Sequence, residues 1–189
     1  MKNKILGGIA IGLGAMFFLT TGEALTFTLG IIIIVSLGLP LFTGYIPLQE
    51  YLNTLSLKEG IFILIGNLIG AFGTGLIVET LPKGAQMVSK ANTIISNKGM
   101  LSAEEMVISG VITGILIGIG VIAYNKRQGD LLGLVALLAS ITAFVALGTD
   151  HVVANAFYMG IVKCGGTQLI VLSGIGNLIG GYIAGKLID

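Results

Sequence analysis

Long stretches with almost no charged residue dominate this sequence. A helix that spans the hydrocarbon core of a bilayer needs about 20 mostly apolar residues. Six stretches of this kind follow one another, at residues 5–21, 25–48, 61–78, 106–124, 131–159 and 169–188. Only 10% of the 189 residues are charged, against about a quarter in soluble domains. We therefore expect an all-α membrane protein with six transmembrane helices in a single domain, residues 1–189.

Charge and residue types exclude several classes of function. Ten basic residues stand against nine acidic ones, so the chain has no excess of positive charge with which to bind nucleic acid. It contains one cysteine, Cys164, and one histidine, His151, which are too few for an internal disulfide or a metal cluster. No nucleophile–base arrangement supports a membrane-embedded enzyme. We expect no cofactor, no metal and no enzymatic activity.

The distribution of lysine and arginine indicates the orientation. Lys2 and Lys4 precede the first apolar stretch, an arrangement that is also typical of a signal peptide. Because five further stretches follow, we expect the first one to be retained as a transmembrane helix. With a cytoplasmic N-terminus, six basic residues lie inside and four outside: Lys2, Lys4, Lys58, Lys126, Arg127 and Lys186 against Lys83, Lys90, Lys98 and Lys163. We expect an integral protein of a bacterial-type inner membrane with both termini cytoplasmic.

The chain contains an internal repeat. The pentapeptide Gly-Asn-Leu-Ile-Gly occurs at residues 66–70 and again at 176–180, an offset of 110. Leu37-Gly38 matches Leu147-Gly148 at the same offset, and Gly12-Leu13-Gly14 is echoed at residues 118–120 at an offset of 106. Because each half then holds three spans, the second half enters the membrane upside down. The sequence predicts a 3+3 inverted repeat.

The second and fifth stretches contain helix-breaking features at related places. Pro40 lies within the second stretch, where proline removes a backbone hydrogen bond, and Asp150-His151 interrupts the fifth. Non-helical backbone at membrane depth requires protein or a water-filled cavity around it. We expect half-helices that resume near Tyr45 and Val153, with their positive N-terminal ends facing a central site suited to an anion.

Side chains near the breaks have two interpretations each. Thr43 and Asn155 either contact the solute or only cap the half-helices. Asp150 and His151 either serve a pathway or pair with each other and cap a helix end. Phe27 and Ile31 lie one turn apart, and Phe144 lies two turns before His151. Aromatic residues at such spacings pack in cores or narrow a passage.

Four motifs, in order along the chain, resemble those of the formate/nitrite transporter family. They are Leu-Phe-Thr-Gly at 41–44, Gly-Asn-Leu-Ile-Gly at 66–70, Asp-His-Val-Val-Ala-Asn-Ala-Phe at 150–157 and Gly-Asn-Leu-Ile-Gly-Gly at 176–181. The octapeptide around the histidine is the most specific of the four. The resemblance implies an aquaporin-like protomer in a homopentamer within the lipid bilayer, with one pore per subunit for a small monovalent anion.

The resemblance also implies roles for individual residues. His151 matches the central pore histidine, and Thr43 the loop threonine that hydrogen-bonds with it, beside Asp150 and Asn155. Phe27 and Phe144 match the outer constriction. The remaining matches are the residues near the inner constriction, Ile31, Leu41 and Phe42, and a vestibule lysine, Lys98.

The chain also departs from the family pattern. It is shorter than most members, Asp150 replaces the more common glutamate, and Gly114 lies where the fourth helix commonly has a pore asparagine.

These observations predict a channel for small monovalent anions of weak acids, such as formate, nitrite, hydrosulfide, acetate or lactate. Imidazole has a pKa near neutrality, so His151 can give the anion a proton or a hydrogen bond. The alternatives are a channel of the same shape for a neutral solute or gas, and a structural membrane protein that no longer transports. The lack of a doubled Asn-Pro-Ala at the breaks argues against an aquaporin.

Overall fold

The computed structural model describes residues 1–163 and 166–188, and Cys164 lies outside them. All regular elements of this part are helical. In chain order they are α1 (Lys2–Thr21), η1 (Ala24–Phe27), α2 (Thr28–Leu37), α3 (Phe42–Tyr51), α4 (Leu57–Leu76), η2 (Val78–Thr80), α5 (Gly84–Gly99), α6 (Ala103–Lys126), α7 (Leu131–Leu147), α8 (Val152–Val162) and α9 (Thr167–Leu187).

The helices reproduce the predicted spans. Four of them are long and apolar enough to cross a membrane: α1, α4 with η2, α6 and α9. The second and fifth spans are bent pairs, with 55° between η1–α2 and α3 and 50° between α7 and α8. Up to six spans thus lie within the described residues, and both predicted breaks are confirmed, at residues 38–41 and 148–151.

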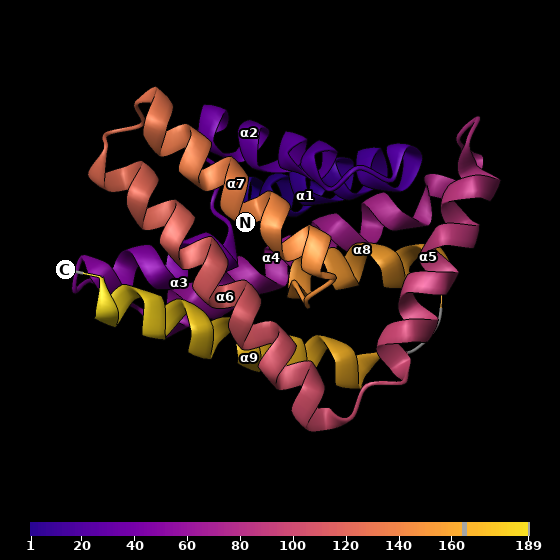
Figure 1. Ribbon diagram of the computed structural model, residues 1–189. Helices are drawn as coiled ribbons and strands as arrows, with labels where there is room; N and C mark the ends of the chain where they lie inside the picture. The colour runs from indigo at the N-terminus through magenta and orange to yellow at the C-terminus, as the bar shows by residue number, and fades with distance from the viewer. Residues whose placement is uncertain (164–165, 189) are drawn as a thin grey trace.

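The repeat is visible in the packing of the helices. Within the halves, α1 packs along α4 and α6 along α9, while each second half-helix crosses to the other half, α3 onto α9 and α8 onto α4. Figure 1 shows α3 and α8 running from the middle of the molecule toward opposite ends. Gly8 of α1 lies against the backbone of Asn67, and Gly114 of α6 lies against that of Asn177. Because small residues let helices approach closely, these glycines hold both pairs in the same register.

One helix was not predicted. The connection between the third and fourth spans contains α5, which packs on α8 and lies at the right edge of Figure 1. Met87, Ala91 and Lys98 are its buried side chains beyond the first residue. Their spacing of four and seven residues is that of one helical face. This periodicity was overlooked because the segment contains no long apolar stretch.

Two buried asparagines from the repeated motif hold the breaks. Asn67 Oδ1 accepts from Phe42 N at 2.9 Å, and its Nδ2 donates to Pro40 O at 3.1 Å. Asn177 Oδ1 accepts from Val152 N at 2.9 Å, and its Nδ2 donates to the backbone oxygen of Asp150 at 2.7 Å. In a membrane such freed backbone groups need a protein partner, so each asparagine stabilises the start of one half-helix.

Candidate functional site

His151 is the N-cap of α8 and lies buried at the second break. Its Nδ1 accepts a hydrogen bond from Ala154 N at 3.1 Å, and its Nε2 lies 2.9 Å from Thr43 Oγ1. A ring nitrogen that accepts carries no proton, so the proton of the neutral imidazole is on Nε2. His151 therefore donates to the hydroxyl of Thr43, and the contact predicted between these two residues is confirmed.

The predicted capping roles of Thr43 and Asn155 are wrong. The N-cap of α3 is Leu41, and the amide of Phe42, the first residue of α3, is bonded by Asn67 rather than by Thr43. Asn155 directs its amide away from the backbone, to Asp150 Oδ1 at 3.0 Å and Ser173 Oγ at 3.3 Å. Both side chains lie within the first turns: Thr43 contacts His151 from the other half of the chain, and Asn155 contacts the nearby Asp150 and Ser173 of α9.

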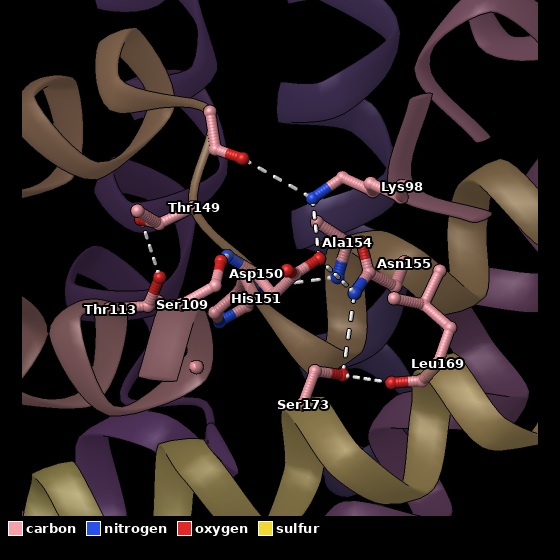
Figure 2. A network of polar contacts seen from close by, with 12 residues as sticks. Lys98, Ser109, Thr113, Thr149, Asp150, His151, Ala154, Asn155, Leu169 and Ser173 are labelled. Atoms are coloured by element: carbon pink, nitrogen blue, oxygen red, sulfur yellow. Dashed lines mark hydrogen bonds and ion pairs between the residues drawn. The ribbon is translucent and has the colours of Figure 1, made fainter. Parts of the chain in front are cut away.

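Asp150 pairs with Lys98 and not with His151. Lys98 Nζ, at the end of α5, lies 2.5 Å from Asp150 Oδ1, as Figure 2 shows. The carboxylate is fully buried and the lysine side chain is 11% exposed. The two charges balance each other. This pairing is needed because burying either charge alone would be strongly unfavourable. Within the described residues, Asp150 Oδ2 and Asn155 Oδ1 are buried without a partner, so the cluster can still accept from a further donor.

A cavity of about 200 Å³ reaches His151 from the side of α5. Its lining includes Lys98, Thr149 and the two phenylalanines predicted for the outer constriction, Phe27 and Phe144. The ring of Phe144 stacks on that of His151 with 5.4 Å between centroids and meets Phe27 edge-on at 5.6 Å. The two rings are buried and still border the cavity, so gate and packing are not exclusive here.

A second cavity, of about 340 Å³, lies on the other side of the breaks. Ile31 and Leu41 line it, together with Tyr45 and Tyr124. Phe42 is buried in the core and is not part of the lining of this cavity or the first one. The hydrogen bond between Thr43 and His151 thus lies between a cavity bordered by His151 and one bordered by Leu41.

Gly114 does not face the site. A side chain at this position would meet the backbone of α9 at Asn177, Gly180 and Gly181. It is the repeat partner of Gly8, and close helix approach explains the glycine. The α6 residues that do reach the break are Ser109, which accepts from Asp150 N at 2.9 Å, and Thr113, which donates to Thr149 at 2.7 Å.

Sequence reasoning missed several polar residues of the site. Asn67 and Asn177 were noted only as part of a repeat, although a buried asparagine duplicated by a repeat is itself a signal of a structural role. Ser173 and the hydroxyls of α6 gave no signal, because serine and threonine are common in membrane helices. No group of three metal-ligating side chains suited to a metal ion occurs among the described residues.

Fold and site together define a class: a helical membrane protein in which two broken spans meet at a buried histidine between two cavities. The family model for the formate/nitrite transporter matches residues 2–188. The chain belongs to that family. It is accordingly a membrane transport protein for anions of the formate and nitrite type and not an enzyme.

Solved structures agree with this fold. One, described as an FNT family ion channel, has a TM-score of 0.78 and 21% identity, covering 96% of this chain and 85% of its own. Another, a pentameric formate channel with formate bound, has a TM-score of 0.78 and 18% identity, covering 96% of this chain and 91% of its own. A search of curated proteins returned no match.

Proposed function

We propose that this chain conducts a small monovalent anion of a weak acid past His151 and Thr43. The observation that carries the proposal is their buried 2.9 Å hydrogen bond between the two cavities. Moving a bare anion from water into an apolar passage costs a large desolvation free energy. The Nε2–H of His151 and the hydroxyl of Thr43 supply donors where that cost is greatest.

His151 acts in this proposal as a neutral donor. A second proton would have to reside on Nδ1, where it would destroy the cap on Ala154 N. The N-terminal ends of α3 and α8 add positive potential at the same place, worth a few tenths to about 1 kcal/mol each for a nearby anion. The balanced pair of Lys98 and Asp150 leaves the cavity of about 200 Å³ that His151 borders, here called the outer cavity, without a large net charge.

The proposed assembly is a homopentamer with one pathway in each protomer. One structural relative is a pentameric formate channel with formate bound, and the outer faces of the spanning helices expose many large apolar side chains, which suit lipid and neighbouring subunits. The proposed location is a bacterial-type inner membrane with both termini cytoplasmic, on the distribution of lysine and arginine described above.

Proteoliposome flux tests the proposal. Formate, nitrite, acetate, lactate and hydrosulfide are compared with glycerol, at several pH values. We expect anion flux above that of empty liposomes and no glycerol flux. Glycerol flux without anion flux would establish the neutral-solute channel instead, and flux of neither in an assembled oligomer would favour a non-transporting protein.

A matched pair of variants separates the pore role of His151 from its capping role. His151→Asn keeps a strong N-cap acceptor for α8 but removes Nε2, whereas His151→Phe removes both. Both variants should lose anion flux, and the asparagine variant should retain the stability of the oligomer. Normal flux in assembled His151→Asn would remove the imidazole from the mechanism.

A further inference from the structure

A pair of hydroxyls, one of which borders the outer cavity, has no role in the mechanism so far. Thr113 Oγ1 donates to Thr149 Oγ1 at 2.7 Å. Thr113 is fully buried, whereas Thr149 is half-buried and lines the cavity that His151 borders. In Figure 2 the pair lies on the other side of the 148–151 loop from Lys98. The cavity therefore has hydroxyl chemistry on one side and an ammonium on the other.

The proton of the Thr149 hydroxyl is available to a solute. In the structure it points to the Phe144 carbonyl at 3.2 Å, a long bond for a hydroxyl donor. That carbonyl also accepts from Thr149 N at 3.2 Å, so it keeps a partner when the hydroxyl turns toward the cavity. The rotation exchanges one weak hydrogen bond for another and leaves no backbone group unpaired.

Thr113 prepares this hydroxyl for donation. Its proton occupies a lone pair of Thr149 Oγ1, which fixes the oxygen and strengthens the O–H as a donor, because successive hydrogen bonds polarise one another. Thr113 is too deeply buried to reach the cavity itself. It is a positioning residue that acts through Thr149.

We propose that the Thr149 hydroxyl binds the anion in the outer cavity before it reaches His151, and that it favours oxyanions over hydrosulfide. Oxygen accepts a hydroxyl proton well and sulfur only weakly, so the preference follows from the atom that faces Thr149. This inference rests on the proposed anion conduction. It adds to it a group that discriminates among the anions.

The experiment measures the half-saturating concentrations of formate and hydrosulfide for uptake into proteoliposomes. The main variant is the double change Thr113→Val and Thr149→Val, because replacing both partners by apolar side chains of the same shape leaves no unpaired hydroxyl. We expect the formate value to rise roughly tenfold, as for loss of one hydrogen bond to an anion. The hydrosulfide value should rise less than about twofold.

Two matched variants complete the test. Thr149→Ser keeps the hydroxyl and serves as the conservative rescue, so its formate value should lie well below that of the double variant. Thr142→Val removes a hydroxyl of α7 itself, which bonds the Leu138 carbonyl at 2.9 Å and borders a separate apolar groove, and it should change neither value.

The results that overturn the proposal are specific. An unchanged formate value in the double variant, or equal changes for both anions, would reduce Thr149 to a structural cap of α7. Should the double variant fail to assemble, Thr113→Val alone must raise the formate value in the same direction, and the absence of a rise refutes the proposal. Failure of the unchanged protein to conduct any anion refutes the proposed function itself and this inference with it.

Discussion

Replacing Asn177 by alanine should be among the most damaging single changes in this protein. The side chain is 1% exposed and makes three hydrogen bonds: from Val152 N at 2.9 Å, to Gly110 O at 2.9 Å and to Asp150 O at 2.7 Å. Gly110 lies within the regular helix α6, whereas Val152 N is at the first turn of α8 and Asp150 O is in the break. Truncation thus leaves two buried backbone groups without a partner.

The magnitude follows from those two groups. An unsatisfied buried donor or acceptor costs about 1–3 kcal/mol, so the substitution should lower the free energy of unfolding by about 2–6 kcal/mol. Interhelical hydrogen bonds in membranes average about 0.6 kcal/mol each, and three of them amount to about 2 kcal/mol, the lower end of that range. The damage is at the start of α8, so flux should fall together with stability.

The assay is the thermal midpoint of the detergent-solubilised oligomer, followed by a folded-state signal and by size exclusion. Asn92→Ala is the control, since Asn92 on α5 is exposed and its amide bonds the Val88 carbonyl of the same helix, at 2.9 Å. Asn67→Ala, the repeat partner, should lose stability to a similar extent as Asn177→Ala. A midpoint for Asn177→Ala equal to that of the Asn92 control would refute the reasoning.

Two further predictions concern residues at or beside the outer cavity. Lys98→Met should destabilise the protein by about 3–5 kcal/mol, because it leaves the buried Asp150 carboxylate without its partner; a second change, Asp150→Asn, should restore most of the thermal midpoint, and no recovery would contradict the pairing. Phe144→Ala should raise flux or relax anion selectivity more than Phe27→Ala, because Phe144 contacts both Phe27 and His151. Loss of assembled protein without any change in selectivity would assign both rings to packing, where such truncations cost about 3–5 kcal/mol.

The spans, the breaks and the repeat were predictable because their signals are local. Apolar length fixes which segments can cross a bilayer, and a proline or a charged pair within an apolar run marks the place where a helix stops. The offset of 106 for the first helix of each half also proved meaningful, since Gly8 and Gly114 occupy the same contact with α4 and α9.

The partners of the breaks were not predictable in the same way. Sequence reasoning searched for caps beside the half-helices, at Thr43 and Asn155, where capping side chains usually lie. The first amides of the two half-helices, those of Phe42 and Val152, bond instead to Asn67 and Asn177. Each asparagine lies 25 residues further along the chain than the amide it bonds. Lys98 contacts Asp150 from α5, a helix that was not predicted because it contains no long apolar stretch. Such contacts depend on how helices cross, and one-dimensional patterns do not specify crossing.

The two halves of the protein have the same backbone arrangement at their breaks but different side chains there. Gly38 and Gly148 both adopt the left-handed conformation, with φ of 61° and 71°. Both half-helices start from an extended N-cap residue whose two chain neighbours are hydrogen-bonded by an asparagine. Yet that N-cap is Leu41 in one half and His151 in the other. The asparagine contacts are the same at both breaks, while the His151 ring adds a cap on Ala154 N that Leu41 cannot make. We therefore expect the Nε2 side of the imidazole to serve the solute, and Leu41 to contribute an apolar side chain to the cavity on the other side of the breaks. If the proposed function holds, the repeat builds the passage, and we expect its selectivity to come from the positions where the two halves differ.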